Sequence, residues 1–437
     1  MEDTLGLRAA LRRDRRSASY QQKQTAAYIK GNRAMSEDDV NRTLADWIHW
    51  YHTYIAGSAA TEPVQLADFT ERFAQMIISA GGAEQIDGIL AVLDGSIALS
   101  EASGGPVSSL YLAKASVLGM GISEDDERRG LYEQAVNAAR PGEPEWMRAM
   151  LALARYKTDT SRYPEALALC QDLQRHLTSA TADFECGVLE EEGIARFTSF
   201  RKLKIARENL LHACEWEDRA SENEAIARWV ASAYHYRARL ADIGGDHGTA
   251  LDLYLRGAEF QRMCPQETYS TAFVHLRISE PLVAMGLFDD AQQHINEAQR
   301  GFGNCRNLAS GDQQAQLGSA TLAAARGDVA RARHIMTGAI DSARERHYWR
   351  GELLGLGFLL ALEVRGLRLG RASRVLWQVL RTLRGGELGR NGVVLVLTRI
   401  PLLLPVAVRR ISRPRIRLGS QQDVPTLPDR CPCALHT

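Results

Sequence analysis

The chain has 437 residues, of which 45% are hydrophobic and 24% charged, and equal numbers of basic and acidic side chains give a formal net charge of zero. That length exceeds a typical single domain, so the sequence encodes either several domains or an array of repeats. The balanced charge gives no reason to expect a nucleic acid or an acidic partner for the whole molecule. Frequent Ala, Leu, Arg and Glu, with only 13 Pro, favour helices.

Residues 1–60 are expected to form a polar segment followed by a capping helix. The first residues carry charges where a secretion signal needs an apolar run, so no export signal is predicted. The amphipathic stretch 39–55 contains His49 and His52, three residues apart on one helical face. Two such imidazoles can hold a metal with a third ligand, but their aromatic neighbours favour packing, and no metal site is predicted here.

A helical phrase recurs along residues 61–385. In residues 286–302, a Gly turn is followed by Ala at the fifth position, a large apolar residue at the ninth and Ala at the twelfth. Related phrases begin at residues 123, 161, 201, 245 and 327. The fifth-position residue serves as an anchor, and successive anchors are 38 to 44 residues apart. The anchors are Arg128, Ala166, Ala206, Ala250, Ala291, Ala332 and Ala372.

This phrase resembles the second helix of a tetratricopeptide (TPR) hairpin, with a repeat near forty residues rather than about 34. The residue four positions after each anchor is apolar, and most residues seven positions after it are small. Anchor, fourth and seventh positions share one helical face, which lets the partner helix approach closely. The Trp, Tyr and closing Pro of the TPR consensus are mostly absent, so a related hairpin solenoid with longer repeats is the alternative fold.

The resemblance implies an all-α, right-handed superhelix, or solenoid, of antiparallel TPR-like hairpins that occupies residues 61–385. A degenerate hairpin is expected before the regular repeats, with helices near residues 66–80 and 84–100. Almost no strand is expected. The second helices of the hairpins are predicted to begin near residues 126, 163, 203, 247, 288, 329 and 370.

Residues 386–437 form a third part with a different composition. Thirteen Arg lie between Arg365 and Arg417 against one acidic residue, Glu387. Residues 393–408 are the most hydrophobic run of the chain, but two prolines interrupt it, and a membrane span needs about 20 residues. The run therefore either packs as the terminal cap of the solenoid or docks on an anionic membrane surface. The residues after it are typical of a disordered tail.

No pattern typical of an enzyme or a cofactor site occurs: there is no phosphate-binding loop, dinucleotide fingerprint, nucleophile elbow or paired-His zinc helix. Cys431, Cys433 and His436 lack a second ligand pair and a rigid support, which favours a disordered end over a metal site. Seven scattered cysteines form no even framework and favour a reducing compartment. The sequence predicts no catalytic, cofactor-binding or metal-binding residue, and a non-catalytic role is favoured over an enzyme.

Six side chains are predicted to face the concave groove of the solenoid. In TPR proteins, positions −6, −3, +1 and +4 from the small residue of the first helix point into the groove, where the resemblance implies peptide recognition. An Arg there can clamp a carboxylate through two parallel hydrogen bonds. The alternative is that these charges are only solvated surface. The candidates are Arg148, Arg155, Glu191, His235, Arg239 and Glu280.

The predicted function is a cytoplasmic scaffold or adaptor that binds a protein or peptide in the groove, because a solenoid leaves one long curved face free. One alternative is an accessory or catalytic component of a biosynthetic or glycan-assembly pathway, recruited to an anionic membrane by residues 386–437. A second is a signal-responsive regulator, since long-repeat TPR arrays occur in bacterial sensor proteins. No helix-turn-helix is evident, so no specific nucleic-acid partner is expected.

Overall fold

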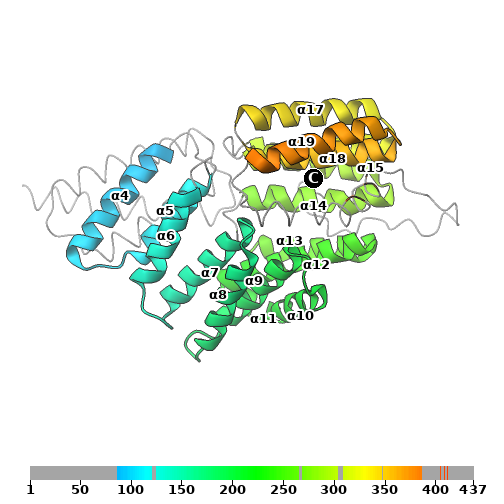
Figure 1. Cartoon of the computed structure of the whole chain (residues 1–437). Coiled ribbons are helices and arrows are strands. Elements are labelled where there is room, and N and C mark those ends of the chain that lie inside the picture. The colour runs from blue at the N-terminus through cyan, green and yellow to red at the C-terminus, as the bar shows by residue number, and fades with distance from the viewer. Residues whose placement is uncertain are drawn as a thin grey trace, which may run out of the picture.

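The computed structural model describes residues 86–385, except 121–124, 265–267, 304–308 and 347, together with residues 404, 408 and 411. Within these ranges the chain forms helices and no strand. Figure 1 shows the helices stacking side by side along a curved path, from α4 in blue to α19 in orange. The predicted all-α, right-handed superhelix of antiparallel TPR-like hairpins is confirmed.

Helix α4 (Ile86–Ser103) precedes seven hairpins. The hairpins are α5 (Ser108–Met120) with α6 (Asp125–Ala138), α7 (Pro144–Asp159) with α8 (Tyr163–Arg175), α9 (Phe184–Thr198) with α10 (Leu203–Cys214), α12 (Glu224–Gly244) with α13 (His247–Gln261), α14 (Thr268–Met285) with α15 (Phe288–Gly303), α16 (Ala309–Arg326) with α17 (Val329–Glu345), and α18 (Trp349–Arg365) with α19 (Leu369–Gly385). Each second helix begins within one residue of its predicted start.

The turns of the hairpins explain why Gly opens the recurring phrase. Gly245 ends α12 with a φ of 89°, a left-handed conformation that favours glycine, and Gly327 ends α16 with a φ of 94°. The next residue caps the following helix: the carboxylate of Asp246 accepts from the backbone N–H of Thr249 at 3.1 Å, and that of Asp328 does the same for Arg331 at 3.0 Å. One Gly-Asp pair thus stops one helix and starts the next.

The anchors lie where the two helices of a hairpin meet. Five of them, from Ala166 to Ala332, have no exposed surface, and Ala372 is almost fully buried. The first anchor, Arg128, is the exception: it is partly buried, with its guanidinium 5.6 Å from the Tyr156 ring centroid. Close approach also explains Gly193 on α9, because a Cβ there would lie 2.7 Å from the side chain of Leu210 on α10. Small residues therefore set the distance between the helices.

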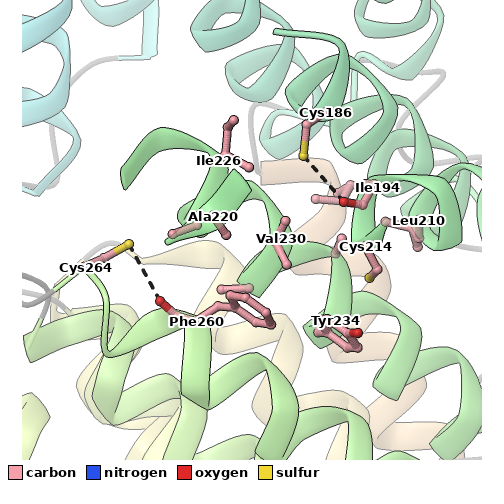
Figure 2. Close-up of a cluster of buried hydrophobic side chains, with 14 residues drawn as sticks. Cys186, Ile194, Leu210, Cys214, Ala220, Ile226, Val230, Tyr234, Phe260 and Cys264 are labelled. Carbon is pink, nitrogen blue, oxygen red and sulfur yellow. Dashed lines mark hydrogen bonds between the residues drawn. The ribbon is translucent and has the colours of Figure 1, made fainter. Parts of the chain in front are cut away.

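Neighbouring hairpins share continuous cores. Figure 2 shows one of them, in which Cys186 and Ile194 of α9, Leu210 of α10 and Phe260 of α13 pack around Val230 of α12. The longest interval between anchors, from Ala206 to Ala250, contains an additional short helix, α11 (Glu217–Ala220), between α10 and α12. The four described cysteines, 170, 186, 214 and 264, are buried free thiols.

Three residues of the C-terminal segment pack against the last hairpins. Leu404 and Val408 contact the core formed by α16 to α19, and Ile411 is buried within it. The guanidinium of Arg365 donates a hydrogen bond to the carbonyl of Ile411, which holds this segment on α18. These contacts are those expected of a terminal cap. No described helix is long and apolar enough to cross a membrane.

The other predictions for the two ends of the chain lie outside the described residues. They include the segment 1–60, the helix expected at 66–80, the His49 and His52 pair, and the tail with Cys431, Cys433 and His436.

Candidate ligand-binding groove

A strip of charged and aromatic side chains runs across the first helices of successive hairpins. We call it the groove strip, and it consists of Arg155 and Asp159 on α7, Glu190 and Glu191 on α9, His235, Tyr236 and Arg239 on α12, and Arg277 and Glu280 on α14. Members on different helices affect one another's pKa: Tyr236 on α12 and the acids of α9 act on Arg155 of α7, and Arg277 and Glu280 of α14 act on Arg239 of α12. Among the six candidates, Arg239 and Glu280 both act on His235, and Glu191 acts on Arg155. Tyr236 connects the two groups, because both Arg155 and Arg239 act on its pKa.

The solenoid curves enough for distant hairpins to share this environment. Arg128 on α6 and Arg350 at the start of α18 both act to lower the pKa of Asp159 at the end of α7. The side chain of Asp159 is exposed at the surface of α7, but other helices lie near its carboxyl group on several sides. Restricted access to bulk water is the largest effect, and it raises the pKa of the carboxyl. Charges from the first and last hairpins therefore both act on the end of α7, in addition to Arg155 of the same helix.

Arg155 is paired within the protein. One of its terminal nitrogens lies 2.5 Å from Oε1 of Glu190, and its Nε donates to the carboxylate of Glu191. Although burial lowers the pKa of Arg155, these two carboxylates raise it well above its ordinary range. The guanidinium links α7 to α9, and its positive charge is already compensated.

The two carboxylates are almost fully buried, with 1% of Glu190 and 2% of Glu191 exposed. Ser232 donates to Glu190 at 2.5 Å and Thr158 donates to Glu191 at 2.6 Å. Burial, with a smaller effect of the neighbouring Glu190, raises the pKa of Glu191 to about 7, although Arg155 and Thr158 act in the opposite direction. One guanidinium thus serves two acids, so this part of the groove strip tends to hold a proton near neutral pH.

Arg239 has a different environment. Its guanidinium lies 5.0 Å from the Phe197 ring centroid and 5.4 Å from that of Tyr236. No carboxylate of the described residues lies within ion-pair distance of it. Burial lowers the pKa of Arg239, and the nearby Arg277 lowers it further. The groove strip therefore contains an enclosed cation that is held by aromatic rings and not by an acid.

The remaining candidates have local partners or none. His235 is a neutral imidazole, because burial and then Arg277 and Arg239 lower its pKa well below the usual range, and it contacts the rings of Tyr236 and Tyr254 edge-on. Glu280 accepts from Arg277 on its own helix. Arg148 is exposed on α7, two turns before Arg155, and has no ion pair within the described part of the chain.

Sequence reasoning missed several members of the groove strip. Asp159, Glu190 and Tyr236 do not occupy the positions carried over from TPR proteins. Asp159 had a usable signal: it lies four residues after Arg155, on the same face of a helix. Phe197, which holds Arg239, gave no such signal, because the stacking of α9 on α12 brings it there.

A separate surface hollow of about 510 Å³ lies between α6, α7 and α8. Lys157 enters it and pairs with Glu165 at 2.9 Å and Glu133 at 3.7 Å, so its charges are compensated. Within the described ranges, no group of three or more metal-ligating side chains occurs. The groove strip is therefore the better candidate site.

No family model matches the sequence, and no curated protein matches it. Among solved structures, a Rap protein complexed with competence and sporulation factor is similar, with a TM-score of 0.48 and 12% identity over 79% of this chain and 99% of that one. A Pyrococcus horikoshii signal-transduction ATPase with a TPR sensor gives 0.45 and 11%, over 86% and 54%. Human IFIT1 with PPP-AAAA gives 0.41 and 11%, over 84% and 98%.

With TM-scores below 0.5, these likenesses add nothing about ligands or residues. The hairpin register, the Gly-Asp turns and the buried small anchors establish the architecture directly. The chain is an all-α solenoid of TPR-like hairpins.

Proposed function

We propose that this chain is a scaffold or adaptor that binds an acidic peptide, or an extended acidic segment of a partner protein, along the groove strip. The observation that carries the proposal is Arg239, an enclosed guanidinium that contacts two aromatic rings and has no carboxylate partner among the described residues. The other two Arg of the groove strip, Arg155 and Arg277, each form ion pairs with carboxylates.

An enclosed guanidinium without a carboxylate partner favours the binding of a ligand that carries a carboxylate. An enclosed charge without a partner is unfavourable, and folded proteins therefore pair most of them. Rings that stack on the guanidinium fix its plane and leave its N–H groups available at the edge. An incoming carboxylate then accepts charge-assisted hydrogen bonds, each contributing about 1.5 to 3 kcal/mol. The order of the side chain is already established before the ligand arrives, which reduces the entropy lost on binding.

The test uses a displayed library of random peptides, selected on the immobilised full-length protein. Affinities of the enriched peptides are then measured for the wild type, for Arg239→Gln and for Arg207→Gln, a matched control because Arg207 is exposed on α10. We expect acidic peptides whose affinity falls at least about tenfold with Arg239→Gln and stays unchanged with the control. A selection that yields no binder, or binders that tolerate the loss of Arg239, contradicts the proposal.

The described residues give the membrane-recruited alternative no support. Leu404 and Val408, which belong to the apolar run, contact the core of the last hairpins, and Ile411 just beyond it is buried there. Side chains that pack in this core cannot also insert among the acyl chains of a lipid bilayer. We therefore propose a peptide or protein, and not a lipid surface, as the partner.

A further inference from the structure

The last described helix, α19, has an exposed side that combines apolar and basic side chains (Figure 1). Its buried side, with Val379 and Leu383, packs in the core of the last hairpins. The three most exposed large apolar side chains of the described residues, Leu367, Leu369 and Trp377, lie on α19 or in the turn before it. The helix contains four Arg and no acidic residue. We call its exposed side the α19 face, and it consists of Leu369, Arg374, Leu376, Trp377, Arg381 and Arg384.

Helical geometry gives the α19 face a basic edge and an apolar edge. Arg374 lies three residues before Trp377 and Arg381 four residues after it, so the three positions share one side of the helix. Leu369 and Leu376, seven residues apart, line the opposite edge of the same side. The position of Trp377 is therefore central, between guanidinium groups and leucine side chains, and the Trp377 side chain is 62% exposed.

The positive charges of the α19 face are not compensated within the described part of the chain. The Nε of Arg374 donates to the carbonyl of Gly370 on its own helix at 3.3 Å, and no described carboxylate forms an ion pair with an Arg of α19. The two acids of the neighbouring α18 are paired elsewhere, since Glu363 binds Arg333 of α17 at 2.6 Å and Glu352 binds Arg344 of α17 at 2.8 Å. A carboxylate for this face must therefore come from a ligand.

The position of α19 in the array also favours a helical ligand. In the other hairpins the second helix contacts the first helix of the next hairpin, as α13 does with α14, α15 with α16 and α17 with α18. No described hairpin follows α19. Leu404, Val408 and Ile411 pack in the core of the last hairpins, yet Trp377 stays largely exposed. A helix that packs along the α19 face would continue the array.

We infer that the α19 face binds an acidic amphipathic helix of a partner protein, with an apolar side chain of that helix on Trp377 and its carboxylates beside Arg374 and Arg381. Trp and Arg are the side chains most enriched among those that dominate binding between proteins. A guanidinium and a carboxylate form charge-assisted hydrogen bonds. No member of the groove strip lies on α19, so this inference is independent of the proposed function and gives the adaptor a second binding surface.

The same features argue against other occupants. A second copy of the chain that packed through the same face would place Arg against Arg, which is repulsive. A lipid surface takes up the apolar side of an interfacial helix, but on α19 that side is buried in the core and Arg side chains occupy the exposed side. A nucleic acid could bind the Arg through its phosphates but would leave Leu369 and Leu376 without apolar contacts.

The test is a displayed library of helical peptides with randomised surface positions, selected on the immobilised full-length protein. We expect helices with an apolar stripe beside two acidic residues about two turns apart, because Arg374 and Arg381 are about 10 Å apart along α19. Their affinity should fall at least about tenfold with Trp377→Ala and with the pair Arg374→Glu and Arg381→Glu. Leu211→Ala and Arg207→Glu, exposed on α10, are matched controls and should bind as the wild type does.

Two further arms exclude indirect effects. The charge-reversed pair should select helices with basic residues at the acidic positions, which shows that it is folded and that charge sets the choice. Arg239→Gln should leave the affinity of the helices unchanged, because it alters only the groove strip. A failure of the present inference therefore leaves the proposed function standing.

The inference is overturned if no enriched helix depends on Trp377, or if the enriched helices show no excess of acidic residues. It is also overturned if the same three side chains bind a single-stranded oligonucleotide, or vesicles of phosphatidylcholine and phosphatidylserine, more tightly than any helix of the library. Circular dichroism and melting temperature should be unchanged in every variant, because the substituted side chains are exposed.

Discussion

His275 on α14 and His294 on α15 face each other inside one hairpin, with their Nδ1 atoms 3.0 Å apart and their ring centroids 5.1 Å apart. Both imidazoles are buried. A hydrogen bond between two imidazole nitrogens needs one that carries a proton and one that does not. Replacing either ring with a side chain that cannot hydrogen-bond therefore removes this bond from the core.

This pair should contribute to the stability of its hairpin. His294→Ala removes the hydrogen bond between the two buried imidazoles, which should lower the free energy of unfolding by about 1 to 3 kcal/mol. Urea unfolding measures the difference, with the exposed His212→Ala on α10 as control. Equal unfolding midpoints for His294→Ala and the control contradict this role.

Glu191 should make folding sensitive to a rise in pH. Burial raises the pKa of its carboxyl to about 7 in the folded chain, well above its ordinary value of 4.5. Between these values the folded state holds a proton that the unfolded state releases. The stability that Glu191 contributes is therefore present below about pH 4.5 and is lost as the pH rises through about 7, by roughly 3 kcal/mol at most.

Glu191→Gln should remove this loss. Its amide resembles the protonated acid: the amide oxygen can accept from Arg155, and the NH2 group can donate to the hydroxyl of Thr158. We expect the variant to be less sensitive than the wild type to a pH rise from about 5 to about 8. Glu208→Gln serves as control, because that carboxylate forms an exposed pair with Lys204 on α10. If both variants and the wild type lose stability equally, the carboxyl at position 191 titrates as an ordinary acid.

The hairpin register predicts that side chains larger than Ala do not fit at the anchors. Ala332 has no exposed surface and lies in the core of the last hairpins. Ala332→Leu should lower the free energy of unfolding by about 1 to 3 kcal/mol through overpacking. Ala330→Leu adds the same atoms to the exposed face of the same helix and should have little effect. Equal melting temperatures for the two variants contradict the packing of α17 on its partner.

The hairpins could be predicted from the sequence because their geometry depends on local features. Gly245 with Asp246 stops one helix and caps the next, and small residues such as Ala250 mark the helix contact, so spacing alone located both. The partners of the groove charges depend instead on how the hairpins stack. Arg155 meets Glu190 and Glu191 from the next hairpin, and no spacing rule predicts which of several acids will face it. The helices that carry these charges were predictable from spacing, and the pairing of the charges was not.

The C-terminal segment provides a test of the terminal cap. Ile411 is buried in the core of the last hairpins, and Ile411→Ala should lower the free energy of unfolding by about 2 to 5 kcal/mol. Leu367→Ala is the control, because that side chain is 83% exposed. If the segment docks on a membrane instead, Ile411→Ala leaves the melting temperature unchanged, and full-length protein sediments with anionic vesicles at low salt.

The last prediction separates the structural Arg of the groove strip from the recognition Arg. Arg155→Ala leaves Glu190 and Glu191 buried without a cation, which should lower the free energy of unfolding by about 3 to 5 kcal/mol at pH 8. Arg239→Gln removes an enclosed charge that has no carboxylate partner among the described residues, so stability should change little while binding of acidic peptides is lost. Chemical unfolding and peptide affinity, measured on both variants, give the comparison. Arg155→Ala combined with Glu190→Gln and Glu191→Gln should recover much of the lost stability, because it removes the uncompensated charges. A destabilised Arg239→Gln with intact peptide binding would assign the two residues the opposite roles.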